Sequence, residues 1–121
     1  MEEHSGHLWL ESIDSVDADG HKEWKYMWFV LDEGYLRYYH KEDSLEPLAT
    51  IPCRGIVVKS VGKARVGKHA FRLDVNKQED GRCKYVLAGD EEADSLVWLE
   101  FLRDHGCSVN ISKIRVRAAA R

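Results

Sequence analysis

A cluster of basic side chains in the second half of the chain is the strongest candidate for ligand binding. Two glycines, Gly62 and Gly67, bracket the middle of this cluster, so we expect a hairpin with a basic loop. Lys and Arg beside an anionic membrane contribute about 1 kcal/mol each. The cluster therefore predicts either a weak, salt-sensitive membrane contact or a loop that is merely solvated. Between residues 59 and 72 it contains no acidic residue and five basic ones, Lys59, Lys63, Arg65, Lys68 and Arg72.

The net charge of the chain hides an asymmetry between its two halves. The 121 residues carry a formal charge of -3, from 18 Lys plus Arg and 21 Asp plus Glu. Residues 1–53 have 4 basic and 12 acidic side chains, whereas residues 54–121 have 14 basic and 9 acidic side chains. We expect no nucleic-acid binding, because the aromatic residues sit in strand patterns where the core needs them and are not interleaved with the basic cluster.

No motif in the sequence supports catalysis. There is no glycine-rich phosphate loop, nucleophile elbow or H-E-x-x-H motif. The three cysteines and six histidines lack the spacing of a disulfide framework or a metal site. We therefore expect a protein that is not an enzyme and needs no metal or cofactor. The apolar runs are short and the N-terminus has no signal region, which predicts a cytoplasmic protein, or one that associates peripherally with membranes.

Most of the chain shows the two-residue hydrophobic period of β-strands. We expect strands at residues 6–12, 23–31, 35–40, 48–51, 56–61, 70–75 and 84–88, separated by turns rich in Gly and Asp. The segment 13–20 is rich in Asp, Ser and Gly and is predicted to be a loop. A chain of this length forms one domain, and the strand spacing is typical of an antiparallel sandwich or barrel.

The hydrophobic period changes to that of a helix over residues 90–105. Asp90 is placed to cap this helix, and Gly106 is a natural stop. We expect the helix to close an open end of the barrel, with Trp98 as its main buried anchor. The apolar stripe recurs at i, i+3, i+4 and i+7, at Ser95, Trp98, Leu99 and Leu102.

Several short motifs occur in an order that resembles a pleckstrin homology (PH) domain. The resemblance covers residues 6–105 and implies a mainly β fold, a seven-stranded antiparallel bent barrel or sandwich capped by one C-terminal α-helix. It implies a non-catalytic module that often brings signalling proteins to phosphoinositides or to protein partners. We accordingly divide the chain into a flank at 1–5, a PH domain at 6–106 and a basic tail at 107–121. The motifs are Gly6-x-Leu8, Trp24-Lys25-x-x-Trp28-Phe29-Val30-Leu31, Leu36-x-Tyr38-Tyr39, Glu46-Pro47-Leu48, Ile51-Pro52 and the late Trp98.

The resemblance also locates the usual phosphoinositide pocket, which this chain supports only in part. In lipid-binding relatives, a basic residue late in the first strand and Lys-x-Arg in the second strand hold the inositol phosphates. Lys25 matches, but Met27 stands at the arginine position, and Leu10 or Glu11 stands at the first-strand position. We therefore expect a weakened pocket, unless its lysines are only solvated. The ligand-binding residues that the resemblance assigns to it are Lys22, Lys25 and Tyr38.

These observations predict a monomeric signalling or membrane-targeting module that binds phosphoinositides or other anionic lipids weakly, through basic loops. The alternative is a protein-interaction or autoregulatory module of a larger signalling protein, without significant lipid binding. Leu96, Val97 and Phe101 lie beside the main stripe of the helix, where they either form an exposed interface or widen its buried face. An open sheet edge could also accept a partner peptide as an extra strand.

Overall fold

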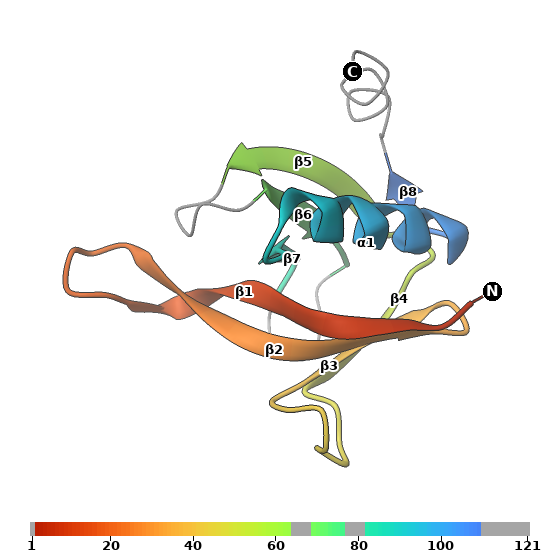
Figure 1. Ribbon diagram of the computed structural model, residues 1–121, viewed down its shortest axis with the longest axis horizontal. Helices are drawn as coiled ribbons and strands as arrows, with labels where there is room; N and C mark the ends of the chain where they lie inside the picture. Colours follow the sequence, from red (N-terminus) through yellow and green to blue (C-terminus); the bar gives the residue numbers. More distant parts are fainter. Residues whose placement is uncertain (1, 64–68, 77–81, 110–121) are drawn as a thin grey trace.

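The computed structural model describes residues 2–63, 69–76 and 82–109, which form eight β-strands and one α-helix (Figure 1). All seven predicted strands and the predicted helix are present. No helix within these ranges is long and apolar enough to span a bilayer. The elements are β1 (His4–Val16), β2 (Lys22–Asp32), β3 (Tyr35–Tyr39), β4 (Ala49–Pro52), β5 (Val57–Lys63), β6 (His69–Asp74), β7 (Lys84–Ala88), α1 (Glu92–Asp104) and β8 (Ser108–Val109).

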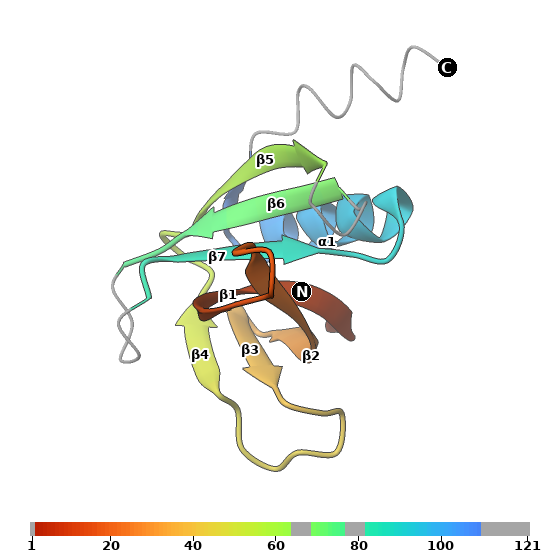
Figure 2. The ribbon, with the colours of Figure 1, turned by 90° about the vertical axis from the view of Figure 1, so that its left-hand side faces the viewer.

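The strands form one bent sheet in the order β4-β3-β2-β1-β7-β6-β5-β8. Neighbouring strands are antiparallel, except that β8 is parallel to β5. The sheet folds over so that β1 to β4 form one layer and β5 to β7 form the other, with α1 packed at one side (Figures 1 and 2). This arrangement confirms the predicted bent sandwich capped by a helix, with an open rather than a closed sheet.

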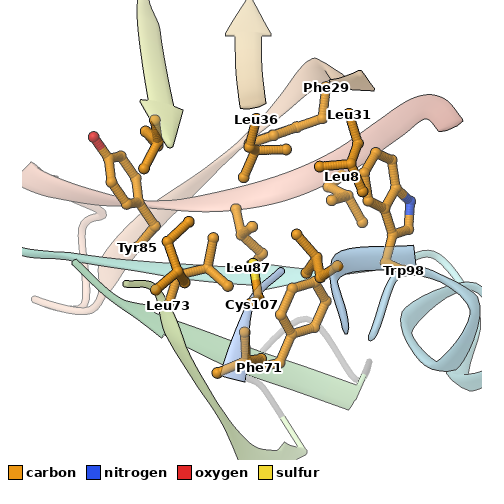
Figure 3. Close-up of a cluster of buried hydrophobic side chains, with 14 of the residues drawn as sticks. Leu8, Phe29, Leu31, Leu36, Phe71, Leu73, Tyr85, Leu87, Trp98 and Cys107 are labelled. Carbon is orange, nitrogen blue, oxygen red and sulfur yellow. The ribbon is translucent and has the colours of Figure 1, made fainter. Parts of the chain in front are cut away.

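The core lies between the two layers and is filled by the inward positions of the strands (Figure 3). Leu8, Leu31 and Leu87 have no exposed surface, as expected where alternate side chains of two layers meet. Trp98 is 3% exposed and places its ring edge-on to Phe29, with a centroid distance of 6.4 Å. The prediction that Trp98 anchors the helix is therefore confirmed.

Strand β1 is longer than the sequence pattern predicts, because it continues through Val16 into the segment predicted as a loop. The β1–β2 register shifts between Glu11 and Val16, and the Ser12 hydroxyl accepts a hydrogen bond from the Ser15 backbone N–H at 3.1 Å. In this irregular part of the strand, Ser12, Asp14 and Ser15 hydrogen-bond to one another, so the segment has no hydrophobic alternation to mark it as a strand. The turn itself begins at Asp17, whose C=O accepts from the Gly20 N–H at 3.0 Å.

The N-terminus of α1 also differs from the prediction, because Glu91 and not Asp90 is its N-cap residue. The Glu91 N–H donates to Asp94 Oδ2 at 3.1 Å. Asp90 instead turns towards the sheet, where its carboxylate accepts hydrogen bonds from two aromatic side chains, Trp9 Nε1–H at 2.9 Å and Tyr26 O–H at 2.5 Å. Tertiary contacts therefore decide which of two adjacent acids caps the helix.

The C-terminal end of the helix leads into a short strand that the sequence does not reveal. Gly106 has a φ of +107°, which confirms it as the helix stop. Residues 108–109 then pair with Val57 and Val58 of β5, so the structured part extends past the predicted domain end at 106. A two-residue strand is too short to show a hydrophobic period. The remainder of the predicted basic tail, residues 110–121, lies outside the described residues.

Candidate ligand-binding surfaces

Of the three residues that the resemblance assigns to a phosphoinositide pocket, Lys25 is the one that is both exposed and on the inward side of its strand. It lies opposite Leu10 in the β1–β2 register, and antiparallel partners share a face, so Lys25 lies on the inward side of β2. Its side chain is exposed because this end of the hairpin extends beyond the core. Of the other two phosphate-holding positions, Met27 is 6% exposed, and the first-strand position falls on either Leu10, which is 4% exposed, or the half-buried Glu11, so neither is basic. This chain therefore has one cation at the three positions that are basic in lipid-binding relatives.

Lys22 does not join Lys25 in a common site. The two residues are three positions apart on β2, so strand alternation places them on opposite faces. Lys22 Nζ lies 3.6 Å from Glu11 Oε1 on the neighbouring strand. Half of the Lys22 side chain is exposed, and such surface pairs are worth at most about 1 kcal/mol. Glu11 therefore offsets only part of the charge of Lys22.

Tyr38 lies in the core and not on the ligand-accessible surface. It is 5% exposed, on the inward face of β3. Its ring stacks on Phe29 with a centroid distance of 5.2 Å and lies edge-on to Tyr85 at 6.0 Å. The family position assigned to it therefore serves packing in this chain, and a direct role in ligand binding stays a prediction.

The turn between β1 and β2 carries acidic side chains close to the start of β2. Asp17 Oδ1 accepts backbone hydrogen bonds from Asp19 at 2.9 Å and from His21 at 3.0 Å. These three side chains are exposed and their potential ligand atoms lie within 4.8 Å of one another. The carboxylates shape the turn, and their charge opposes the approach of a polyphosphate headgroup.

The basic cluster predicted between residues 59 and 72 is partly neutralised by an acid that lies just outside that window. Lys59 and Arg72 face each other across β5 and β6. Asp74 lies two residues along β6 from Arg72, on the same face, and its carboxylate is 2.9 Å from Arg72 Nε and 3.3 Å from Lys59 Nζ. The i, i+2 spacing of Arg72 and Asp74 is the sequence signal for this contact, because residues with that spacing share a face when the segment is a strand.

The pKa of Asp74 shows which influence dominates at this site. Desolvation by burial raises the pKa of its carboxyl, but hydrogen bonds and charges from Arg72 and Lys59 outweigh that effect, and the pKa is lowered overall. Asp74 is therefore ionised at neutral pH and shared by two cations. For the rest of the cluster, the structure gives the backbone pairing of Lys63 with His69, whereas Arg65 and Lys68 lie outside the described residues.

The ends of two hairpins lie on the same side of the molecule. Figure 1 places the end of β5, at Lys63, on the side of the β1–β2 turn, and Figure 2 views the molecule from that side. Two apolar side chains of β1 are exposed at this end, Ile13 by 55% and Val16 by 59%. This end therefore combines Lys25, exposed apolar groups and the start of the basic connection between β5 and β6.

A second surface was missed in the sequence, where strand aromatics were expected to fill the core. The outward positions of β1 and β2 carry aromatic side chains that form a row of contacts. Tyr26 is 42% exposed and stacks on His7 at a centroid distance of 4.7 Å, and Trp9 contacts Tyr26 at 4.7 Å. The alternation of β2 gives the signal, since Trp24, Tyr26 and Trp28 have the opposite parity to the buried residues.

The fold is a bent open sheet with one helix packed against it. Residues 2–105 match the PH domain family model, and the chain belongs to the PH domain family. It is therefore a module for signalling, membrane targeting or protein interaction.

Three known proteins illustrate this likeness. The human Rho GTPase-activating protein 25 is 29% identical over 102 residues, which cover 78% of this chain and 15% of that protein. The PH domain of human KIAA0053 protein has a TM-score of 0.68 at 24% identity, covering 90% of this chain and 92% of that one. The C-terminal PH domain of pleckstrin, solved in complex with D-myo-Ins(1,2,3,4,5)P5, has a TM-score of 0.62 at 25% identity, covering 85% and 96%.

Proposed function

We propose that this PH domain docks weakly on anionic membranes by distributed charge and not through a tight phosphoinositide pocket. The observation that carries the proposal is the environment of Lys25. The two neighbouring positions are occupied by buried Met27 and by either buried Leu10 or acidic Glu11, none of which offers a donor to a phosphate. A headgroup at this site would meet one lysine beside an acidic turn, which supports low affinity and poor isomer selectivity.

The basic connection between β5 and β6 supplies the remaining attraction. Residues 59–74 contain five basic residues and one acidic residue, Asp74, a net charge of +4. Asp74 offsets part of the charge of Lys59 and Arg72, which leaves Lys63, Arg65 and Lys68 as the main contributors. At about 1 kcal/mol each near an anionic surface, three cations strengthen binding by roughly 150-fold at low salt.

The experiment is co-sedimentation with two kinds of phosphatidylcholine vesicle, one with about 30 mol% phosphatidylserine and one with a few per cent phosphoinositide. Each is measured at low and at physiological salt. We expect binding to both vesicle types, weakened by salt and lost in a variant with Lys63, Arg65 and Lys68 all changed to Glu. The control compares Lys63→Glu/Lys68→Glu with Arg54→Glu/Arg103→Glu, which changes the net charge equally at other surfaces. Unchanged pelleting of the triple variant, or tight binding to one phosphoinositide isomer, would contradict the proposal.

The helix offers little support for the alternative function of protein recognition. Leu96 and Phe101 are partly buried and pack against the core, so they widen its buried face. Phe101 also stacks on His4, with a centroid distance of 4.3 Å. Val97 is the one member of this group that is well exposed, at 43%. A single exposed valine is ordinary for a soluble domain and does not define an interface.

A further inference from the structure

The outer face of the β1–β2 hairpin is aromatic where a solvent-facing sheet surface is usually polar. The register pairs Trp9 with Tyr26 and His7 with Trp28 across the two strands. Both pairs have outward parity, opposite to buried Leu8. Within the described residues, the helix and the second layer of the sheet lie on the other side of these strands (Figure 1). The face is thus an exposed surface of unusual composition.

The rings of this face form one continuous row. Tyr26 lies between Trp9, at a centroid distance of 4.7 Å, and His7, also at 4.7 Å. His7 in turn contacts the edge of Trp28 at 4.9 Å. Cross-strand aromatic contacts stiffen a hairpin, which accounts for the row but not for the surface it leaves exposed. Tyr26 keeps 42% of its surface exposed, and Trp9 and Trp28 are only partly buried.

The charges around this row are predominantly acidic. Asp90 accepts hydrogen bonds from both Trp9 and Tyr26. A hydrogen bond to Asp90, desolvation and the negative charges of Asp90 and Asp94 raise the pKa of Tyr26 to about 12. Glu11 is the next outward residue of β1 after Trp9, although it also pairs with Lys22. Ring faces attract cations, and here carboxylates reinforce that attraction.

One guanidinium is already bound on the neighbouring part of the same face. Arg37 and Tyr35 are outward residues of β3, and Arg37 Cζ lies 5.3 Å from the centroid of the Tyr35 ring. Arg37 is the register partner of Val30 on β2. This contact is an example of a guanidinium packed over an aromatic ring on the outer face of the same sheet.

We propose that the outer face of β1 and β2 is a docking surface for an arginine-bearing, extended segment of a partner protein. Arginine is favoured because its planar, weakly hydrated guanidinium can stack on an indole or phenol ring while it pairs with a carboxylate. An anionic membrane is disfavoured, since Asp90, Asp94 and Glu11 would repel it. This surface is distinct from the basic connection of the membrane proposal, so either proposal can fail without the other.

The probe is a synthetic dodecapeptide of alternating arginine and serine, titrated into the ¹⁵N-labelled domain. The four tryptophans provide the readout through their indole N–H signals. Trp9 and Trp28 lie on the proposed surface, whereas Trp98 is 3% exposed and serves as an internal reference. We expect the Trp9 and Trp28 signals to shift and saturate, the Trp98 signal to stay, and a glutamate–serine peptide to cause no shift.

Two variants test whether the carboxylates and rings act together. Asp90→Asn removes the charge; its one amide oxygen can still accept from Trp9 Nε1–H, while its NH2 group would have to donate to the Tyr26 hydroxyl oxygen. We expect this variant to weaken peptide binding about fivefold, or about 1 kcal/mol. Asp43→Asn is the matched control, because it removes the same charge from an exposed loop and should leave binding unchanged. Glu11→Gln provides a second charge removal that does not touch the rings, should Asp90→Asn unfold.

Several results would overturn the proposal. These are absent shifts at the face indoles, equal shifts with the acidic peptide, or unchanged affinity in both Asp90→Asn and Glu11→Gln. Shifts caused by anionic vesicles alone would assign the face to membranes. Concentration-dependent association without peptide, measured by analytical ultracentrifugation, would assign it to a second copy of the chain.

Discussion

The buried hydroxyl of Ser95 joins three elements at the base of the helix. Ser95 is 2% exposed, on the first turns of α1. Its Oγ–H donates to the His69 C=O at the start of β6 at 2.8 Å. The same oxygen accepts a hydrogen bond from the Gly89 N–H, just after β7, at 3.0 Å. Changing Ser95 to Ala therefore removes the partner of two backbone groups at once.

The expected loss of stability follows from these two contacts. A backbone donor or acceptor left buried without a partner costs about 1–3 kcal/mol. The hydrogen bond to the His69 C=O is only partly buried, so solvent can compensate in part, and we expect Ser95→Ala to lower the free energy of unfolding by about 2–4 kcal/mol. For a domain of this size, each kcal/mol corresponds to a change in Tm of about 4 °C, which gives about 8–16 °C.

The assay is urea and thermal unfolding followed by far-UV circular dichroism and tryptophan fluorescence. The matched control is Ser5→Ala, which removes the same atoms from an exposed position on β1 and should change stability by less than about 0.5 kcal/mol. A loss below about 1 kcal/mol in Ser95→Ala would refute the reasoning. So would a loss equal to that of the control.

Three further substitutions test a partly buried histidine, an ion-pair cluster and a tightly packed glycine. Burial lowers the pKa of His4 below 6.5 in the folded protein. The contribution of the neutral imidazole to stability should therefore be complete above pH 6.5 and decrease as the pH falls below that value. In His4→Phe, the urea midpoint should not show this decrease. Asp74→Asn should cost up to about 1 kcal/mol at pH 7, through the partners Arg72 and Lys59. Because the folded pKa of Asp74 is lowered, wild type and variant should converge in stability as pH falls below 3.8, and persistent divergence would contradict the pairing. Gly89→Ala would place a methyl group 2.7 Å from a helix Cβ, so we expect a loss of about 1–3 kcal/mol in thermal unfolding, and an unchanged Tm would show that the backbone gives way.

The candidate sites were predictable only in outline. The sequence singled out Lys25 and the basic segment that follows Lys59 as candidates, because both depend on residue type and order. It could not show that Lys22 pairs with Glu11 or that Tyr38 is buried, since both depend on contacts between strands. The sequence also could not show that Asp74 pairs with two cations, because these contacts arise from strand geometry.

The sequence by itself determined the element types and the family of this protein. Residues buried at every second position produce strands, and the recurrence that ends at Leu102 produces the one helix, because each period brings apolar groups to a single face. These periods depend only on residues near each other in sequence, whatever the apolar face later contacts. The order of the motifs, from Gly6 to Trp98, then identified the PH family before any distance was known.

Only the tertiary structure decided which groups meet. Both faces of β2 carry aromatic side chains, so the sequence does not show which face is buried. Phe29 lies in the core and Tyr26 in the outer row because the second layer of the sheet covers the Phe29 side. Asp90 does not cap the helix, because its carboxylate accepts hydrogen bonds from Trp9 and Tyr26, which are 81 and 64 residues away in sequence. Long-range pairing of this kind is set by sheet register, which residue order alone does not specify.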